Sequence, residues 1–568
     1  MYLDNKLYVA HCDNGPLCLT GKMCNRHGLI AGATGTGKTV SLQVLAETFS
    51  QAGVPCFMAD MKGDLSGISQ TGKMTSFIEK RGKEFGVENP EFQPCPVRFY
   101  DVYGKKENGF PLRATISSLG PQLLARLMDL NETQTGVLNI VFKIAEDHQL
   151  LLIDLKDLRL MLDFVGKNAS KFTTAYGNVT AASIGAIQRS ILAIDSEGGD
   201  KFFGEPAFDI EDLLDVENGK GVMSVLVADE LMLNPKLYST FMLWLMTELY
   251  AKLPEVGDLD LPKLVFFLDE AHMLFNGTSK ALVDKLEQVI RLVRSKGVGI
   301  YFITQSPTDI PDNILGQLSN RVQHALRAFT PKEQKDVRAA AETFRANPNF
   351  KTEEAIMTLE TGEALVSFLD EKGAPMMVER AKMLFPLSQI GAITEGQRLD
   401  VQNAAPARIK GYAEYYDRES AYEVLKAENE QIAAQEEEAR AAKEAAKAAK
   451  EAEKAEKEAA KEAARVEREN ARAAKEAEKE AARAAKEAEK EAAKKKGCFK
   501  KIFSAIALAV VGSVGRSVGT SVGKAVTGQK SKNSSKSTGG DILGKAAKTA
   551  TTTATRKVTE EVLKSIFK

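Results

Sequence analysis

The sequence predicts an α/β fold in which a mainly parallel sheet is flanked by helices and carries an inserted helical subdomain. Uninterrupted apolar runs, typical of strands covered on both faces, alternate with helical patterns. A glycine-rich loop follows one of these runs and precedes a helix, and two acids end another. With 568 residues the chain exceeds a single core, so we expect two or more structural units.

The glycine-rich loop matches the phosphate-binding pattern G-x-x-x-x-G-K-[ST] and lies between an apolar run and a predicted helix. Its residues are Gly32, Ala33, Thr34, Gly35, Thr36, Gly37, Lys38 and Thr39, and with Val40 they form the predicted ATP-binding set. Backbone N–H groups of the loop and the helix start would surround the phosphates. Lys38 would reach the β- and γ-phosphates, and the Thr39 hydroxyl would join the coordination of Mg²⁺.

Composition excludes several kinds of site and segment. The six cysteines form no C-x-x-C pair and only five histidines are present, so neither a zinc site nor a disulfide framework is supported. This usage predicts a reducing, cytoplasmic location. The N-terminus has no basic segment leading into an apolar core, which argues against a secretory signal, and the chain contains no run of eighteen apolar residues.

Changes in periodicity and composition divide the chain into predicted segments. They are short N-terminal strands (1–25), the first part of the core (26–110), a helical insertion (111–216), the second part of the core (217–386), a linker or lid (387–420), an extended helix (421–497), and an apolar, glycine-spaced segment with a low-complexity tail (498–568). The N-terminal strands, at 7–10 and 16–19, are expected to lie against the nucleotide fold.

Acids follow two of the predicted buried strands. The strand at 264–268 runs into Asp269 and Glu270. Asp269 would hold the water shell of Mg²⁺, and Glu270 would orient and polarise the water that attacks the γ-phosphate; alternatively, both acids are solvated at a strand end. Asp60 and Asp64 follow an earlier strand, and either could face the metal or only cap a turn.

Further candidates lie beyond this strand. His272 could couple the nucleotide state to neighbouring contacts or be an ordinary hydrogen-bonded histidine. The predicted helix at 280–296 is apolar on one face and leaves Arg291 and Arg294 near the other. Gln305 ends the next strand, where an amide suits sensing of the γ-phosphate or positioning of water.

Five motifs follow one another through the core. They are 26–30 leading into the phosphate loop, 59–67 (ADMKGDLSG), 266–272 (FFLDEAH), 291–299, and 303–307 (ITQSP). In this order, over about residues 20–420, they resemble the HerA/FtsK superfamily of ring ATPases, and more narrowly its bacterial HerA-like helicase subfamily. The resemblance implies a RecA-like P-loop NTPase core, usually a hexameric ring with ATP bound between subunits.

The resemblance also implies roles for arginines. Arg294 matches the arginine that reaches into the neighbour's site in trans, Arg26 is a second interface candidate and Arg321 a weaker third; each could instead be a surface ion-pair arginine. DNA translocation is implied by the resemblance alone. The core has no basic stripe with interleaved aromatics that would indicate DNA binding by its charge. About 25 residues precede Arg26, so the small β-barrel that precedes the core in archaeal HerA is expected to be absent.

The C-terminal third has a different composition. From about residue 420 to 496 it is almost entirely Ala, Glu, Lys and Arg, which favours a solitary helix of about 110 Å acting as a spacer, with self-association along alanines as the rival interpretation. Residues 498–527 combine Cys498, an apolar run and glycines at every fourth position. They could contact another subunit, a protein partner or a membrane surface, or be loosely ordered.

The leading functional hypothesis is therefore a Mg²⁺-dependent ATPase that forms a ring and moves or remodels DNA. The alternative is an ATP-gated scaffold with slow hydrolysis, which positions a partner or membrane surface through its C-terminal helix. A nucleotide switch without turnover is a third possibility, disfavoured by Glu270.

Overall fold

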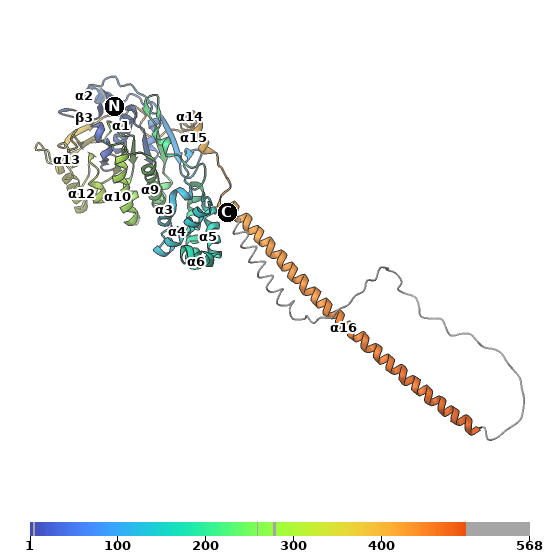
Figure 1. Cartoon of the computed structure of the whole chain (residues 1–568). Helices are drawn as coiled ribbons and strands as arrows, with labels where there is room; N and C mark the ends of the chain where they lie inside the picture. The colour runs from blue at the N-terminus through green and yellow to red at the C-terminus, as the bar shows by residue number, and fades with distance from the viewer. Residues whose placement is uncertain (4–5, 258, 276–279, 496–568) are drawn as a thin grey trace. The chain divides into compact units, whose positions relative to one another are not determined.

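The computed structural model describes residues 1–3, 6–257, 259–275 and 280–495 (Figure 1). Within these ranges, thirteen strands pair into one sheet in the order β1-β2-β15-β14-β13-β4-β12-β11-β5-β10-β6-β7, with β3 added to β2. The strands from β13 to β7 are parallel, whereas β1, β2, β3, β14 and β15 pair in antiparallel fashion. The mainly parallel α/β fold predicted from the sequence is confirmed.

The bounds of the sheet strands are β1 Tyr2–Leu3, β2 Lys6–Cys12, β3 Gly15–Leu19, β4 Gly28–Ala31, β5 Cys56–Asp60, β6 Val97–Asp101, β7 Phe110–Pro111, β10 Met223–Val227, β11 Leu264–Leu268, β12 Val298–Thr304, β13 Asn320–Gln323, β14 Glu363–Ser367 and β15 Glu379–Met383. A separate ribbon pairs β8 (Val216–Glu217) with β9 (Lys220–Gly221). The helices are α1 Lys38–Gln51, α2 Ser76–Phe85, α3 Ile116–Leu127, α4 Glu132–Asp147, α5 Leu155–Lys167, α6 Ala169–Tyr176, α7 Ala181–Ile194, α8 Asp200–Phe202, α9 Pro235–Lys252, α10 Lys280–Val293, α11 Asp312–Leu315, α12 Pro331–Glu342, α13 Thr352–Thr358, α14 Glu395–Ala404, α15 Ala407–Lys410 and α16 Ala421–Lys495.

Strands β4 and β11 have no polar side chain because both faces of the sheet are covered. In β4, Leu29 and Ala31 belong to one core, shared with α9, α10 and the helices between β7 and β8, whereas Ile30 belongs to the core shared with α1 and α2. The same division separates Phe266 from Phe267 in β11. This alternation of faces explains the uninterrupted apolar runs in the sequence.

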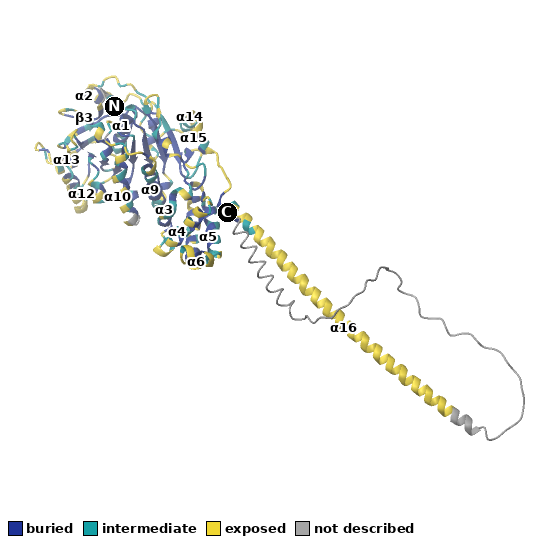
Figure 2. Cartoon of the chain, in the orientation of Figure 1, coloured by how far each residue is buried: buried dark blue, intermediate teal, exposed yellow. Residues whose placement is uncertain are grey.

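Helices α3 to α7 lie where apolar periodicity predicts a helical insertion. Side chains suited to capping mark two of their starts: Asn131 and Asp154 each form a capping box, with Gln134 and Asp157 respectively. Their buried residues share a core with α9, so these helices pack onto the sheet face and not apart from it. Figure 2 shows this buried interior and the exposed outer surfaces.

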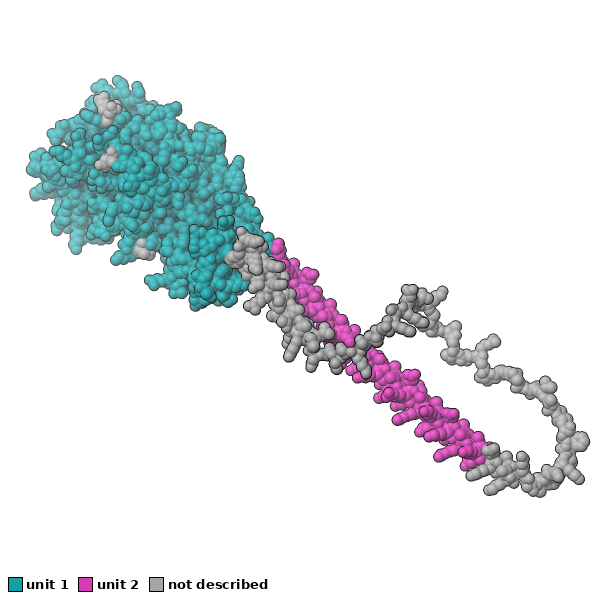
Figure 3. Space-filling view, viewed as in Figure 1, with its two compact units in different colours: residues 1–428 teal, residues 429–568 magenta. Residues whose placement is uncertain are grey.

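The chain forms two compact units, residues 1–428 and 429–568 (Figure 3). The finer segment boundaries expected from the sequence remain predictions. The extended helix of the sequence analysis corresponds to α16, whose side chains are exposed from residue 431 to 488. Residues 496–568, including Cys498 and the rest of the predicted contact segment 498–527, lie outside the described residues.

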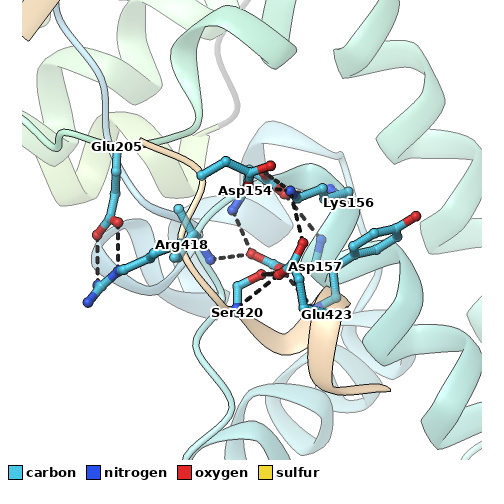
Figure 4. A network of polar contacts seen from close by, with 10 residues as sticks. Asp154, Lys156, Asp157, Glu205, Arg418, Ser420 and Glu423 are labelled. Atoms are coloured by element: carbon cyan, nitrogen blue, oxygen red, sulfur yellow. Dashed lines mark hydrogen bonds and ion pairs between the residues drawn. The ribbon is translucent and has the colours of Figure 1, made fainter. Parts of the chain in front are cut away.

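The first turn of α16 is anchored to α5 within the first unit (Figure 4). The buried carboxylate of Asp157 accepts hydrogen bonds from the Ser420 hydroxyl and from the backbone N–H of Tyr422, and its other oxygen accepts from the N–H of Ile153 and Asp154. Ala421 and Leu425 are buried in the same core as α5. The start of the long helix is therefore fixed by buried polar and apolar contacts together.

Among the described helices, we find none that is long and apolar enough to cross a membrane.

Candidate functional site

The phosphate loop connects β4 to α1, and its glycines are required by the backbone. Gly37 adopts φ +110° at the N-cap of α1, a conformation that favours glycine. A Cβ on Gly32 would lie 2.5 Å from the Cβ of His324 on the adjacent segment. The N–H groups of Lys38, Thr39 and Val40, in the first turn of α1, lie beyond the reach of intrahelical acceptors and suit an anion.

Lys38 lies over the loop that precedes it. Its ammonium nitrogen donates to the carbonyl oxygens of Gly32 at 2.7 Å and Ala33 at 3.1 Å. Burial lowers the pKa of Lys38, and the nearby carboxylates of Glu270 and Asp269 partly oppose that shift. The loop lysine and the two acids that follow β11 therefore belong to one electrostatic site.

His324, which the sequence analysis did not single out, lies beside the loop and links α1 to the start of β14. Its Nδ1 lies 2.9 Å from the carbonyl oxygen of Glu363, and its Nε2 lies 2.9 Å from the hydroxyl of Ser41 in α1. Because a carbonyl only accepts, Nδ1 carries the proton and Nε2 accepts from Ser41 in the neutral ring. Burial lowers the pKa of His324 to about 4.

Acid is expected to destabilise the protein through His324. The folded pKa of about 4 lies below the ordinary value of about 6.5, so the unfolded chain binds the proton more tightly. The resulting stability is present above pH 6.5 and is lost as the pH falls through 4. At pH 5 the loss amounts to roughly 2 kcal/mol.

The measurement is the free energy of unfolding by denaturant at pH 7 and pH 5, for the parent chain and for His324→Asn. We expect the parent to lose more stability between the two pH values than the variant does. His27, also buried with its pKa lowered to about 4, contributes equally to both chains and cancels in the difference. An equal loss in parent and variant would contradict the assignment.

Asp269 and Glu270 extend from the end of β11 into the site. Both are buried, with 9% and 6% of their surfaces exposed. Burial, reinforced by the neighbouring Glu270, raises the pKa of Asp269 to about 6. Glu270 has φ +48° and ψ +45°, a left-handed backbone conformation that is strained for a residue with a Cβ. Such strain is typical of residues held in place for function.

The two carboxylate oxygens of Glu270 have different surroundings. Oε1 accepts from the ammonium of Lys62 at 2.5 Å, whereas Oε2 is buried without a hydrogen-bond partner among the described residues and lies 3.4 Å from Nδ1 of His272. Burial alone would raise the pKa of Glu270, but the bond and charge of Lys62 outweigh it and lower that pKa. Glu270 is therefore held as a carboxylate whose Oε2 accepts no hydrogen bond from the described residues.

Asp60 caps a turn. Its oxygens accept from the backbone N–H groups of Lys62, Gly63 and Leu65 at 2.8 to 3.3 Å, and Asp64 is exposed. Burial raises the pKa of Asp60 to about 6. The turn-capping alternative for Asp60 is thus the one observed.

A magnesium ion fits the remaining oxygens. The Thr39 hydroxyl, in the first turn of α1, and the Asp269 carboxylate are hard oxygen ligands at the same sheet edge. In the described part of the chain, no group of three or more His, Cys, Asp or Glu could hold a metal by itself. Mg²⁺ commonly binds through one or two protein oxygens together with waters and substrate phosphates, which suits this donor set.

Gln305 follows β12 and faces the open side of the loop. With Ala33, Thr34 and His272 it lines a cavity of about 450 Å³. Because β12 lies between β4 and β11 in the sheet, its end comes between the phosphate loop and the two acids. The role of Gln305 in sensing the γ-phosphate or positioning water stays a prediction.

The candidate arginines lie at the other edge of the sheet. Arg26 precedes β4 and Arg294 precedes β12, so both are at the amino ends of strands whose carboxyl ends carry the site. Seven residues of β12 separate the two edges by about 20 Å. Asn25 donates to the carbonyl oxygen of Arg294 at 3.4 Å, which places the two arginine segments together. Within one chain, neither arginine is brought to the loop.

Arg321 has a structural role. Its guanidinium donates to the carbonyl oxygens of Leu315, Leu318 and Thr343 at 2.8 to 3.0 Å, and burial lowers its pKa. These bonds use three of its five N–H groups within its own chain, which favours a structural role, and the interface role expected at this position stays a prediction.

The chain is similar to several known proteins. A model of the family described as helicase HerA-like C-terminal matches residues 5–529. A relative, the DNA double-strand break repair helicase HerA of Sulfurisphaera tokodaii, is 31% identical over 109 residues, which are 19% of this chain and 21% of the relative. The match thus spans about a fifth of that relative's length.

Two solved structures are similar to this chain at low identity. The bacterial conjugative coupling protein TrwB is 15% identical, with a TM-score of 0.43 over 69% of this chain and 92% of that one. VirB4 of Thermoanaerobacter pseudethanolicus is 13% identical, with a TM-score of 0.42 over 66% of this chain and 96% of that one.

Proposed function

The chain belongs to the helicase HerA-like C-terminal family of P-loop ATPases, and from that premise we propose that it is a Mg²⁺-dependent ATPase that forms a ring and couples hydrolysis to movement or remodelling of DNA. The observation that carries the proposal is the buried Glu270 carboxylate near Lys38, one oxygen of which accepts no hydrogen bond from the part of the chain that the structure describes. A protein that only binds nucleotide has no need of such a group.

The residues of the site divide the work of hydrolysis. The loop N–H groups and Lys38 bind and orient the phosphates, and Thr39 and Asp269 would hold Mg²⁺, which would neutralise phosphate charge. Oε2 of Glu270 orients and polarises the attacking water and draws its proton. Gln305 donates to the γ-phosphate or to that water.

Arg294 and Arg26 complete the site from a neighbouring subunit. They lie at the sheet edge opposite the phosphate loop, so a neighbour's loop is the one that they could approach. A ring in which each subunit's amino edge meets the next subunit's site is a closed heterologous assembly, and a hexamer is the number that kinship suggests. The guanidinium groups would stabilise charge that develops in the transition state.

DNA is proposed as the partner by kinship with a DNA repair helicase. The test is ATP turnover by the full-length protein at low salt, with and without double-stranded DNA, with Glu270→Gln as the blank. We expect DNA to stimulate turnover and the stimulation to fade as salt rises, because phosphate contacts release counterions. Turnover that ignores DNA at every salt concentration would contradict the DNA-coupled part of the proposal.

The anchored helix α16 favours a second candidate function. Buried contacts to Asp157 fix the start of a 75-residue helix, and a helix of this length could position a partner in response to ATP. In that case hydrolysis would be slow, and truncation after Glu428 would abolish assembly. DNA-stimulated turnover that survives the truncation would favour the motor.

A further inference from the structure

The loop after β5 delivers a lysine to the catalytic glutamate. Asp60, the last residue of β5, folds this loop by accepting from the backbone N–H groups of Lys62, Gly63 and Leu65, and Gly63 makes the turn at φ +80°. The carboxylate of Asp60 is 3% exposed, so the turn is fixed from inside the protein. Lys62 lies within the turn, and its side chain therefore has a defined starting point.

Lys62 makes a short contact with only one of the two carboxylate oxygens of Glu270. Its Nζ lies 2.5 Å from Oε1 of Glu270, in a charge-assisted hydrogen bond. The Glu270 side chain is 8% exposed and the Lys62 side chain 49%, so the lysine reaches the buried carboxylate from the solvent side. Oε2 does not share this contact.

This difference between the two oxygens of Glu270 affects how the side chain can orient the attacking water. A carboxylate that could rotate about its last bond would present either oxygen, in a range of directions. A charged donor on Oε1 removes this freedom, because rotation would break the bond at 2.5 Å. The strained backbone of Glu270 fixes the base of the same side chain.

We propose that Lys62 is a positioning residue for ATP hydrolysis, which holds Oε1 of Glu270 so that Oε2 is the oxygen that orients the attacking water. This inference rests on the proposed function, because it assigns Lys62 a role only through Glu270. Lys62 does not itself touch the phosphates in this role, which distinguishes it from Lys38.

The test compares Lys62→Ala and Lys62→Arg in the full-length protein, with Lys73→Ala as a control for loss of an exposed lysine nearby. Loss of positioning should lower kcat about 10- to 100-fold, with little change in KM or in the affinity for a fluorescent ATP analogue. Lys62→Arg should recover part of kcat, because it restores a charged donor. An increased KM with kcat unchanged would overturn the proposal, since it would indicate contact with the nucleotide.

A double-mutant cycle separates this inference from the function on which it rests. If Lys62 acts through Glu270, then Lys62→Ala added to Glu270→Gln should cause no further loss in single-turnover hydrolysis. Additive losses would overturn the positioning role. Parental turnover by Lys62→Ala while Glu270→Gln is inactive would overturn the positioning role alone, whereas parental turnover by Glu270→Gln would overturn the hydrolysis mechanism as well.

Discussion

Glu270→Gln is expected to lower kcat for ATP hydrolysis by about 10²- to 10⁴-fold while nucleotide binding is retained. Glutamine keeps the size and shape of the side chain and can still accept from Lys62, so the fold of the site should survive. It lacks the negative charge and the basicity needed to polarise water and draw its proton. The loss should therefore appear in the chemical step.

The measurement pairs steady-state phosphate release with the affinity for a fluorescent ATP analogue. Glu287→Gln is the matched control, because Glu287 also forms a glutamate ion pair, with Arg291 at 2.9 Å, but lies on α10 away from the loop. Its kcat should remain near that of the parent. Near-parental turnover by Glu270→Gln would leave a nucleotide-binding protein whose hydrolysis, if any, depends on another base.

The strands of the core were predictable because their signals are local. The runs that become β4 and β11 are apolar at every position, and each ends in residues with a recognisable chemical pattern. Periodicity similarly indicated helices in the insertion, and composition indicated α16. The pairing of β2 with β15 was not predictable, because it joins segments about 370 residues apart through backbone hydrogen bonds that any side chains could accompany.

The candidate site likewise contains residues that local motifs predict and residues whose contacts only the folded chain shows. Lys38, Asp269 and Glu270 stand in motifs whose spacing alone conveys their chemistry. Lys62 and His324 act on partners 208 and 283 residues away in the sequence, so only folding shows what they contact. Lys62 stood beside Asp60 in a segment that was already of interest for its acids. The turn explains why an acid and a lysine stand together in this segment. Asp60 shapes the loop, and Lys62 makes the contact with Glu270.

Arg294→Ala is expected to lower kcat by about 10³-fold or more if the residue supplies transition-state charge to a neighbour. The substitution should leave nucleotide binding within one chain intact, because Arg294 lies a strand's length from that chain's own loop. Arg291→Ala is the matched control: it removes an exposed arginine one turn earlier, whose partner is Glu287 of the same helix. Its turnover should stay near that of the parent.

Mixing variants tests whether the charge comes from a second chain. An Arg294→Ala subunit retains Glu270, and a Glu270→Gln subunit retains Arg294, so one inactive chain could complete the site of the other. In randomly mixed rings at equal amounts, about a quarter of the interfaces would pair an intact site with an intact arginine. Turnover should therefore rise well above that of either variant alone and peak at equal amounts. If rings that demonstrably contain both variants recover no activity at any ratio, the arginine does not act across the interface. The proposed ring, in which the amino ends of one subunit's strands meet the next subunit's site, must then be abandoned.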